Sequence, residues 1–510
     1  MTTDAMREAE RDRELREPEL DREACYRAMR ARDARFDGRF YTAVVSTGIF
    51  CRPVCPARPP RAEHCVFYRS AAAAHAAGFR PCLRCRPELA PGLAGWRGTA
   101  NTVSRALALI AEGAWREDDD VEALAERLGV GGRHLRRLFA LHVGAPPIAV
   151  AQAQRVFFAK RLLAETAMPV AEVALASGFG SVRRFNDVMR RTFDRAPREL
   201  RRAAAAAPAD GSIALRLACT TPYPWPPMLA FLAARAIPGV EEVEGDEYRR
   251  AFALDDAAGS VAVRPLPGAS QLLASIRISR VAALPAVVGR IRRLFDLDAD
   301  AGAIDAHLAR DRDLAPLVRA RPGLRVPGAW DQFELAVRAI LGQQVSVAAA
   351  RTIAGRIAEA HGQRVPGARP GLAFPGPERL AKAPLDGVGL PRARAAAIAA
   401  LSRAVLEDPS LLRPTAELDA TVERLAALPG IGPWTAQYVA MRAFREPDAF
   451  PASDLGLLRA MARGGVRPTA AELARRAEAW RPWRAYAAEH LWNAGASSAR
   501  PAKPGRRASR

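Results

Sequence analysis

The alternation of apolar and polar residues changes character along the chain and divides it into regions. Residues 25–95 consist of short apolar runs interrupted by Cys, Pro and Gly, and they are expected to form a small α+β module. Residues 100–202 instead place apolar side chains three and four positions apart, which predicts successive amphipathic helices. An Ala-rich joint that contains Pro208, Asp210 and Gly211 then interrupts the helical pattern.

Strand-like alternation follows this joint, and a second helical region follows the strands. Residues 212–283 mix alternating apolar positions with one expected helix, Met228–Ala236, which predicts a small α+β domain. The alternating positions are Ile213, Leu215, Leu217, Val261 and Val263. From about residue 284 to residue 495 the pattern is helical again, with loops expected at residues 321–329 and 365–377.

The composition is that of a globular protein with an excess of positive charge. The chain has 510 residues, of which 49% are hydrophobic and 26% are charged. At roughly 100–200 residues per domain this length corresponds to about three or four domains. Lys and Arg number 76 against 55 Asp and Glu, so the formal net charge is +21. A polyanion is therefore the first partner to consider, although a GC-rich genome is an alternative source of the arginines.

The chain ends and the cysteine content bear on the cellular compartment. Residues 1–23 are acidic, are expected to be flexible, and lack the order of basic, apolar and small residues that marks a signal peptide. Residues 497–510 form a basic polar tail that is expected to be disordered. Prolines interrupt the uncharged stretch 217–234, so no transmembrane helix is expected. Seven cysteines are too few for a disulfide-built secreted fold of this length, which favours the cytoplasm.

Four of the cysteines form two close pairs in the first region. The pattern is Cys-x3-Cys, then 26 residues, then Cys-x2-Cys, which lets four thiolates occupy the corners of a tetrahedron as a closed Zn²⁺ site requires. Disulfides are the weaker alternative in a reducing cytoplasm, and spacing alone is also compatible with a purely structural zinc site. Cys25 and Cys65 are expected to be ordinary thiols. The expected zinc ligands are Cys51, Cys55, Cys82 and Cys85.

The sequence around these cysteines resembles a known DNA repair domain. Residues 47–55 (TGIFCRPVC) and 77–85 (AGFRPCLRC) are similar to the N-terminal domain of the Ada family, and the resemblance covers roughly residues 24–90. That domain removes methyl groups from DNA phosphotriesters, so the resemblance implies that Cys51 is the methyl acceptor. A zinc-bound thiolate stays deprotonated at neutral pH and can attack a methyl carbon without a separate base. Methylation also removes a negative charge, which is expected to raise the affinity for DNA.

Two helix-turn-helix patterns follow this region. An amphipathic segment at residues 121–130 precedes a basic segment at residues 133–139, and a second pair occupies residues 170–176 and 181–192. Helix, tight turn and basic helix is the layout whose second helix enters the major groove. The two copies together resemble the AraC-type DNA-binding domain over about residues 100–202.

The candidate base contacts lie on the two expected recognition helices. They are Arg133, His134, Arg136, Arg137, Arg183, Arg184 and Asn186. Gly131 and Gly132 stand where the AraC family usually has a Ser or Thr cap followed by Pro. The first recognition helix is therefore expected to be poorly capped and its base readout less sharp.

A third DNA-binding motif lies in the C-terminal half. Residues 428–436 (LPGIGPWTA) form a helix-hairpin-helix sequence, in which Gly430 and Gly432 let the backbone turn and bring amide N–H groups onto a phosphate. A plain turn between bundle helices would explain a lone Gly-x-Gly. Asp454, however, follows Trp434 by twenty residues, and a hairpin followed by this Asp is typical of the helix-hairpin-helix DNA glycosylases.

The resemblance to one glycosylase family extends over about residues 212–495. Residues 321–328 (RPGLRVPG), 338–347 (RAILGQQVSV) and 480–484 (WRPWR) are similar to 3-methyladenine DNA glycosylase II, the AlkA type. Residues 212–283 fit the N-terminal domain of that family.

This resemblance implies a role for each matching residue. Asp454 would be the catalytic carboxylate, and Trp434, Tyr438 and Trp492 would form the aromatic pocket for the flipped base. A 3- or 7-alkylpurine is cationic, so stacking on aromatic rings favours it, and catalysis needs mainly an anion beside the oxocarbenium-like sugar. Gln344 would fill the vacated stack, where the AlkA type can carry Leu. Bifunctional relatives place a nucleophilic Lys at the position of Trp434, so this chain is expected to hydrolyse only the glycosidic bond.

The combined expectation is a mainly α-helical multidomain protein for DNA alkylation repair and its regulation. Its expected parts are an acidic N-terminus (1–23), a zinc-binding α+β methyl-acceptor domain (24–95), an AraC-type double helix-turn-helix domain (96–203), a linker (204–211), an α+β domain (212–283), an all-α helix-hairpin-helix glycosylase domain (284–496) and a basic tail (497–510).

The expected cofactor is Zn²⁺, and the expected partners are double-stranded DNA with alkylated bases, methylphosphotriesters or promoter sites, together with RNA polymerase. No membrane partner is expected, and the expected location is the nucleoid in the cytoplasm. The alternative is an AraC-type transcriptional activator whose glycosylase half is an inactive scaffold. The Pro-Cys-His-Arg sequence of the alkylguanine transferase found in full-length Ada is absent from the sequence.

Overall fold

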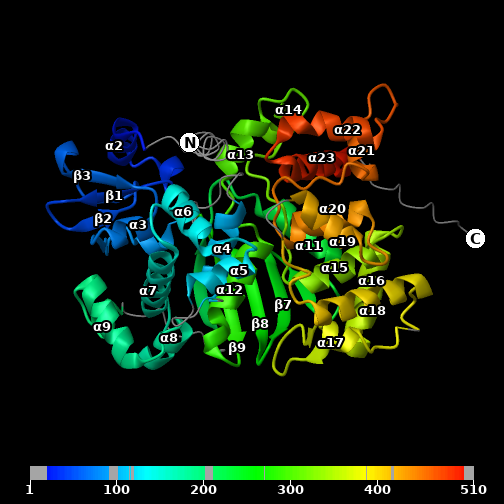
Figure 1. Ribbon diagram of the computed structural model, residues 1–510, viewed down its shortest axis with the longest axis horizontal. Coiled ribbons are helices and arrows are strands. Elements are labelled where there is room, and N and C mark those ends of the chain that lie inside the picture. Colours follow the sequence, from blue (N-terminus) through cyan, green and yellow to red (C-terminus); the bar gives the residue numbers. More distant parts are fainter. Residues whose placement is uncertain are drawn as a thin grey trace, which may run out of the picture.

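The chain folds into a cysteine-containing module, a helix-turn-helix region, a five-stranded sheet and a helical C-terminal domain (Figure 1). The computed structural model describes residues 20–90, 101–113, 115, 120–201, 211–268, 270–385, 387–414 and 418–498. The expectations for the acidic N-terminus, for most of the linker and for most of the basic tail therefore lie outside the described residues. Among the helices of these ranges, none combines the length and the apolar character that a membrane span needs.

The N-terminal module is built on a four-stranded sheet. Its elements are α2 (Arg22–Ala31), η1 (Ala34–Phe36), β1 (Tyr41–Val44), β2 (Ile49–Cys51), η2 (Ala62–His64), β3 (Cys65–Tyr68), α3 (Ala71–Ala76), β4 (Arg80–Pro81) and η3 (Pro87–Leu89). Side chains cap the first turns of two helices, Asp21 in α2 and Ser70 in α3. The strand order is β3-β1-β2-β4, and β2 runs parallel to β4. The parallel pair therefore brings two segments that are distant in the sequence to the same end of the sheet.

The helix-turn-helix region consists of two helical units joined by one long helix. Its elements are α4 (Asn101–Ala111), α5 (Val121–Arg127), α6 (Gly132–His142), α7 (Pro147–Glu165), α8 (Val170–Ala176), α9 (Val182–Phe193) and α10 (Pro197–Leu200). The predicted series of amphipathic helices is confirmed. Leu135 and Phe139 bury one face of α6, and Phe185 and Met189 bury one face of α9. The opposite faces of both helices stay exposed.

A five-stranded antiparallel sheet follows, as the alternating apolar positions predict. Its elements are β5 (Ile213–Ala218), α11 (Trp225–Arg235), β6 (Glu241–Glu244), β7 (Glu247–Leu254), β8 (Ala257–Pro265) and β9 (Gln271–Ile278), with the strand order β5-β9-β8-β7-β6. The helix expected at residues 228–236 begins earlier, at Trp225. Pro226 and Pro227 fit its first turn, because the first N–H groups of a helix have no partner within the helix.

The C-terminal domain is helical, as predicted. Its helices are η5 (Val281–Ala283), α12 (Leu284–Leu294), α13 (Ala301–Leu308), α14 (Ala315–Ala320), α15 (Gln332–Leu341), α16 (Val347–His361), α17 (Pro377–Leu380), α18 (Arg392–Glu407), α19 (Leu418–Ala426), α20 (Pro433–Ala443), α21 (Leu455–Ala460), α22 (Ala470–Ala477), η6 (Glu478–Trp480) and α23 (Arg484–Ser498). A short hairpin departs from the all-α expectation: β10 (Gln363–Arg364) directly precedes the loop expected at residues 365–377, and β11 (Leu372–Ala373) lies within it.

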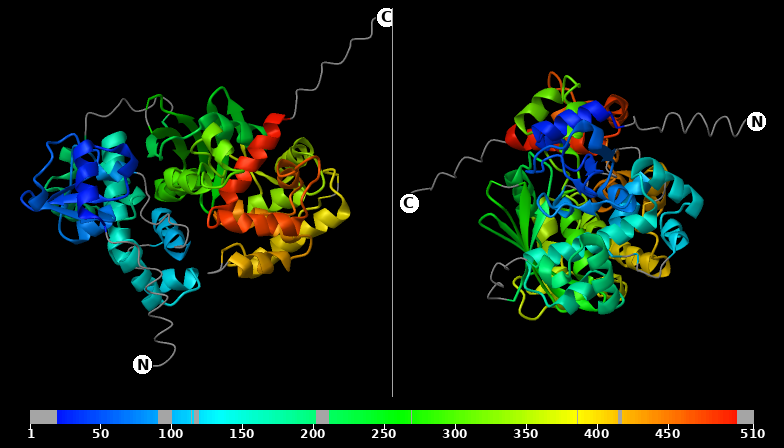
Figure 2. Two further views of the ribbon diagram at one scale, coloured as in Figure 1. Left: turned by 90° about the horizontal axis from the view of Figure 1, so that it is seen from above. Right: turned by 90° about the vertical axis from the view of Figure 1, so that its left-hand side faces the viewer.

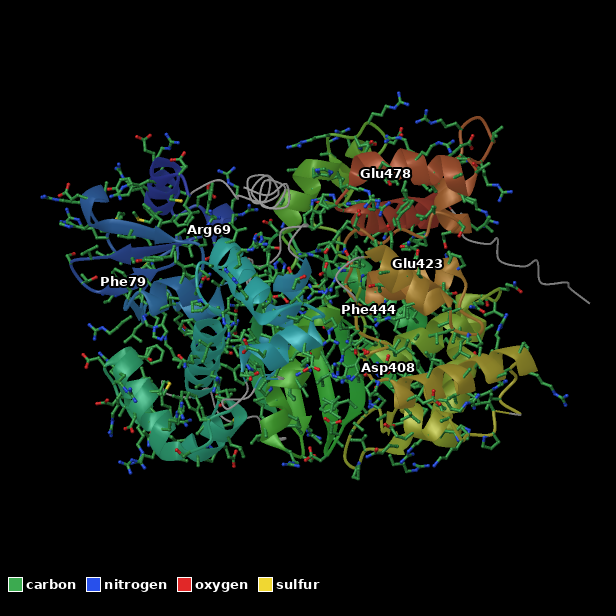
Figure 3. The ribbon with its side chains drawn as sticks, in the orientation of Figure 1. Arg69, Phe79, Asp408, Glu423, Phe444 and Glu478 are labelled. Carbon is green, nitrogen blue, oxygen red and sulfur yellow. The ribbon has the colours of Figure 1, made fainter. Side chains whose placement is uncertain are left out.

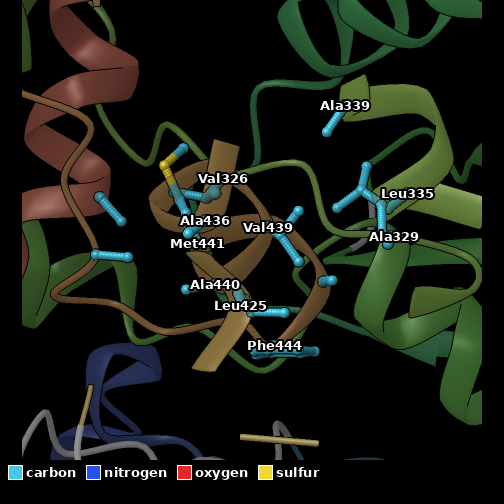
Figure 4. Packing of buried hydrophobic residues seen from close by; sticks show 14 of the residues in the cluster. Val326, Ala329, Leu335, Ala339, Leu425, Ala436, Val439, Ala440, Met441 and Phe444 are labelled. Atoms are coloured by element: carbon cyan, nitrogen blue, oxygen red, sulfur yellow. The ribbon is translucent and has the colours of Figure 1, made fainter. Parts of the chain in front are cut away.

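Helix α20 lies in the middle of the core of this domain. Ala436, Val439 and Ala440 on its inner face are fully buried and pack with Leu425 of α19 and with residues of α15 (Figure 4). This packing fixes α20 along its length, so side chains on its other face are held in a defined direction.

The regions also pack against one another (Figure 2). Lys160 on α7 donates a hydrogen bond to Glu88 of η3 at 2.9 Å, and Arg39 of the N-terminal module pairs with Asp300 of the C-terminal domain at 2.6 Å. The buried apolar core below α8 and α9 continues into the five-stranded sheet and α12. The second helix-turn-helix unit and the sheet therefore share one core.

Candidate functional site

The four paired cysteines meet at one point of the N-terminal module. Cys51 ends β2 and Cys82 follows β4, and the parallel pairing of Phe50 with Pro81 sets these two cysteines side by side. Cys55 and Cys85 return from the turns that follow, so the four sulfur atoms all lie within 4.8 Å of one another. A compact set of four thiols fits the tetrahedral sulfur coordination of Zn²⁺.

The surroundings distinguish Cys51 from the other three thiols. Cys55, Cys82 and Cys85 are buried, with 7–8% of their surface exposed, whereas Cys51 is partly exposed. The backbone N–H of Arg52 donates a hydrogen bond to Sγ of Cys85 at 3.3 Å. Within the described ranges no such bond reaches Sγ of Cys51. A thiolate that is accessible and receives no hydrogen bond from a backbone N–H is the more reactive nucleophile.

A groove of about 650 Å³ opens beside this cysteine cluster. Arg58 and Arg84 of the N-terminal module line it, and so does Arg195 at the end of α9. Arg80 and Asp194 also line the groove and form an exposed ion pair of 3.0 Å between the module and the helix-turn-helix region. The positive side chains suit a phosphate backbone that would have to reach the partly exposed thiol.

The two other cysteines of the module behave as the sequence predicts. Burial and the nearby carboxylate of Asp21 raise the pKa of the Cys25 thiol to about 11. Burial also raises the pKa of Cys65, whose Sγ donates a hydrogen bond to the carbonyl oxygen of Arg61 at 3.3 Å. Both thiols stay protonated at neutral pH and are poor nucleophiles.

The first recognition helix is α6, and it presents its basic residues to solvent. The exposed residues are Arg133, His134, Arg136 and Arg137. Gly131 stands at the N-cap and supplies no side-chain hydrogen bond to the first turn, so the expected weak cap is confirmed. Arg136 instead pairs with Glu122 of α5 at 2.8 Å, which restrains its guanidinium before DNA binds.

The second recognition helix is α9, and it has a proper cap. The Ser181 side chain accepts a hydrogen bond from the backbone N–H of Arg184 at 3.1 Å. Arg183 and Arg184 are exposed, while Asn186 is partly buried. Both helices therefore present arginines to solvent, but only α9 has a side-chain cap at its start.

The helix-hairpin-helix sequence joins α19 to α20. Gly430 has a φ of +79°, and a Cβ atom there would lie 2.5 Å from Cβ of Ala397, so only glycine fits. Gly432 is the N-cap of α20 and is exposed, which leaves the first amides of α20 open to a phosphate. The Gln343 side chain donates hydrogen bonds to the Gly430 carbonyl oxygen at 2.8 Å and to Oγ1 of Thr435 at 3.0 Å. These bonds tie the turn after α15 to the hairpin.

Gln344 lies at the tip of that turn. It is exposed and has a φ of +54°, which is unusual for a residue other than glycine. Gly342 and Val345 on either side line the cavity that also contains Asp454. The structure therefore places Gln344 at the mouth of the candidate base pocket.

Four hydrogen-bond donors hold the carboxylate of Asp454. Oδ1 accepts from the backbone N–H groups of Gly456 and Leu457 at 2.8 and 3.1 Å, because Asp454 is the N-cap of α21. Oδ1 also accepts from Nε1 of Trp492 at 2.8 Å, and Oδ2 accepts from Nε1 of Trp434 at 2.9 Å. The carboxylate is thus fixed in position and is directly joined to two of the predicted pocket aromatics.

The third predicted aromatic completes one wall of the pocket. The rings of Trp434 and Tyr438, one turn apart on α20, are stacked with centroids 5.3 Å apart and planes 10° from parallel. Asp454, Trp492 and these two rings line a cavity of about 590 Å³. The structure therefore brings the three aromatic residues expected in the base pocket together with Asp454, the expected catalytic carboxylate.

Polar groups that the sequence did not predict also line this cavity. Arg442 donates a hydrogen bond to the Tyr438 hydroxyl at 2.5 Å. Burial raises the pKa of that hydroxyl, but the positive charges of Arg442 and Arg235 outweigh it and lower the pKa below its ordinary value. Glu489 on α23 also lines the cavity. Its carboxyl is buried, and burial raises its pKa to about 7.

Helical spacing is the signal that could have pointed to two of these groups. Arg442 follows Tyr438 by four positions on α20, and Glu489 precedes Trp492 by three positions on α23, so each shares a helix face with a predicted pocket residue. Gly456 could not have been found in this way. A Cβ atom there would lie 2.9 Å from Oδ1 of Asp454 and 3.1 Å from Cδ1 of Trp492, which only the folded structure reveals.

Four protein families match successive parts of the chain. They are the metal binding domain of Ada (residues 24–88), a helix-turn-helix domain (124–203), the AlkA N-terminal domain (214–331) and the HhH-GPD superfamily base excision DNA repair protein (337–485). The Ada match and the cysteine cluster together identify Zn²⁺ as the cofactor of the N-terminal module.

Three relatives resemble nearly the whole chain or a part of it. A Mycobacterium tuberculosis protein described as "Probable bifunctional transcriptional activator/DNA repair enzyme AlkA" is 43% identical over 479 residues, which cover 92% of this chain and 96% of that protein. DNA-3-methyladenine glycosylase 2 of Escherichia coli is 37% identical over 53% of this chain and 94% of its own length. The bifunctional transcriptional activator/DNA repair enzyme Ada of Escherichia coli is 40% identical over 26% of this chain and 35% of its own length.

These matches agree with the resemblances inferred from the motifs. Similarity at 43% identity along nearly all of both chains shows that this chain belongs to the family of bifunctional transcriptional activator/DNA repair enzymes, in which an Ada-type zinc domain and a helix-turn-helix domain are joined to an AlkA-type DNA glycosylase.

Proposed function

We propose that the C-terminal half excises 3-methyladenine and related alkylated purines from DNA, with Asp454 as the catalytic carboxylate. The observation that carries this proposal is the convergence of that carboxylate with three aromatic rings on one cavity. A flipped purine can stack on the paired rings of Trp434 and Tyr438, and a cationic alkylpurine gains most from such stacking. The family to which the chain belongs supports the same reaction.

Asp454 supplies the negative charge that the reaction needs. As the glycosidic bond breaks, positive charge develops on the sugar, and the fixed carboxylate stabilises it without having to reorient. The cationic alkylated base takes the bonding electron pair and leaves as a neutral base, so its departure needs no general acid, and the positive charge remains on the sugar. Water then adds to the sugar and releases a proton to solvent, which completes the hydrolysis.

The glycosylase is expected to stop at the abasic site. Trp434 occupies the position where bifunctional relatives have a nucleophilic Lys, and its Nε1 is already bound to Asp454. An indole nitrogen cannot form a Schiff base with the sugar. Gln344 at the cavity mouth is expected to fill the stack that the flipped base leaves, and the hairpin amides near Gly430 and Gly432 are expected to hold the strand by a phosphate.

Incubation with methylated duplex DNA tests this proposal. Wild-type protein should release free 3-methyladenine, leave the strand intact at the abasic site and give no adduct on borohydride treatment. A trapped protein–DNA adduct would contradict the monofunctional assignment. Promoter binding without any base release would show instead that the glycosylase half is a scaffold of an AraC-type activator.

For the N-terminal module we propose stoichiometric transfer of a methyl group from a DNA phosphotriester to Sγ of Cys51. Cys55, Cys82 and Cys85 would remain as zinc ligands throughout. Zn²⁺, when bound, keeps the thiols deprotonated at neutral pH. The partial exposure of Cys51 and the basic groove beside it support the choice of this thiol.

The transfer is an in-line displacement at the methyl carbon. A carbon–sulfur bond forms at Cys51 while the carbon–oxygen bond breaks, and the electron pair of that bond stays on the phosphate oxygen as a phosphodiester anion. Peptide mapping after reaction should find the methyl group on Cys51. Label on Cys65, or no label on the protein, would contradict the assignment.

The two helix-turn-helix units are proposed to bind promoter DNA and to recruit RNA polymerase in the cytoplasm, at the nucleoid. The base contacts would come from Arg133, His134, Arg136 and Arg137 on α6 and from Arg183, Arg184 and Asn186 on α9. Loss of a negative charge when Cys51 is methylated should raise promoter affinity at matched salt concentration. A promoter affinity that is the same before and after methylation would contradict this regulation.

A further inference from the structure

An acidic side chain that the proposed reaction does not use lies in the wall of the base cavity. Glu489 on α23 is 5% exposed and lines the same cavity as Asp454. It shares a helix face with Trp492, which binds Asp454 directly. Nδ2 of Asn493, one turn further along α23, donates a hydrogen bond to Oε1 of Glu489 at 2.9 Å. Buried carboxyl groups are rare unless a charge partner compensates them.

Two arginines supply the compensating charge, and both lie near Tyr438 in the wall of the cavity. Arg442 donates its hydrogen bond to the Tyr438 hydroxyl, and its Cζ atom lies 5.4 Å from the Tyr438 ring centroid. Cζ of Arg442 and Cζ of Arg235 lie 4.4 and 3.8 Å from the Phe231 ring centroid, so both guanidinium groups lie against one phenyl ring. Both arginines line the cavity with Glu489.

The two arginines would weaken the binding of a cationic base unless a negative charge compensates them. Two positive charges beside Tyr438 repel a cationic alkylpurine, although the aromatic rings attract it. Asp454 contributes one negative charge to the same cavity, and an ionised Glu489 contributes a second, so that these two carboxylates balance the two arginines in number.

We propose that Glu489 is a specificity-determining residue, whose carboxylate neutralises Arg235 and Arg442 so that the pocket accepts cationic alkylpurines in preference to neutral purines. This inference rests on the proposed glycosylase function. It assigns the preference for cations to a charge balance in the pocket wall, in addition to stacking on the rings.

The same cluster makes the preference sensitive to pH. Burial raises the pKa of Glu489 to about 7, although Arg442 and Arg235 act in the opposite direction. The carboxyl is therefore charged above neutral pH and uncharged below it. The other helices packed on α23 carry Asp454 at the start of α21, the exposed Arg319 on α14, and the exposed Glu478 at η6 (Figure 3). Preference for the cationic base should rise as the pH increases through neutrality.

The test compares two purines of similar shape in the full-length protein. Excision of 3-methyladenine, which is cationic in DNA, and of hypoxanthine, which is neutral, is measured under single-turnover conditions across neutral pH. The variant is Glu489→Gln, which keeps the size and the acceptor for Asn493. The matched control is Glu359→Gln, the same change at an exposed position of α16.

In Glu489→Gln, 3-methyladenine excision above neutral pH should fall by about ten-fold or more, the lower end of the effect of one nearby opposite charge. Its rise with pH should disappear, while hypoxanthine excision and the control variant stay at wild-type rates. Wild-type rates on 3-methyladenine in Glu489→Gln, or a parallel loss on both bases, would overturn the inference. Wild-type protein that releases neither base would instead refute the proposed glycosylase function.

Discussion

Replacing Asp454 by Asn removes one charge and leaves the size of the side chain unchanged. The remaining oxygen can keep its bonds from Gly456, Leu457 and Trp492, and Asn is a good N-cap, so the start of α21 should survive. The amide NH₂ that replaces Oδ2 then faces Nε1 of Trp434, which is itself a donor. The Asp454→Asn variant should therefore fold and bind DNA but lack the anion beside the sugar.

The expected loss has two parts. A preorganised group that stabilises developing charge contributes on the order of 3–4 kcal/mol, or about 10²–10³ in rate. The lost bond from Trp434 leaves a partly buried donor without a partner, which costs about 1–3 kcal/mol of folding stability. The excision rate should thus fall by at least about 100-fold, while the free energy of unfolding decreases by about 1–3 kcal/mol.

Single-turnover release of 3-methyladenine measures the rate, and binding to a duplex with a tetrahydrofuran abasic-site analogue checks the fold. Asp408→Asn is the matched control, because Asp408 is an exposed residue at the end of α18 (Figure 3). Near-normal excision by Asp454→Asn would refute the role of the carboxylate. Loss of duplex binding together with excision would show that the residue is needed for the fold.

Three further perturbations test other parts of the structure. Gly456→Ala places a Cβ atom 3.1 Å from Cδ1 of Trp492, so excision should fall by about ten-fold through a displaced pocket ring; an unchanged rate would contradict this. Burial alone would raise the pKa of Glu241, but its arginine partners have the larger effect and lower the pKa to about 2. The contribution of ionised Glu241 to folding stability is therefore complete above the ordinary pKa of 4.5 and is lost as the pH falls toward 2. Glu241→Gln should cost about 3–5 kcal/mol at neutral pH and flatten the acid dependence in denaturant titrations. Chelation of zinc should unfold the N-terminal module and abolish methyl transfer, while base release persists.

The cysteine site could be predicted because its geometry is encoded locally. Each pair sits on a short turn, so sequence spacing nearly fixes the sulfur positions once β2 and β4 pair. The weak cap of α6 at Gly131 could also be predicted from the sequence, since a cap depends on one residue and its own helix. Asp454 and the aromatic residues were found through a sequence resemblance, and the structure shows their hydrogen bonds.

The charge cluster in the wall of the base pocket could not be predicted in this way. Arg235, Arg442 and Glu489 come from α11, α20 and α23, which belong to different parts of the sequence and converge only in the folded chain. Each residue alone looks like an ordinary charged position on a helix. The contacts between the N-terminal module and the other regions, such as the pair of Arg39 with Asp300, have the same long-range origin.

The central claim is that one chain repairs both bases and phosphates of alkylated DNA, and one labelling experiment tests it most directly. Wild-type protein is incubated with duplex DNA that carries radiolabelled methyl groups, and the label is measured separately as free base and as protein adduct. The structure predicts free 3-methyladenine in solution and a stoichiometric label confined to Cys51. Label that stays entirely on the DNA would contradict the account.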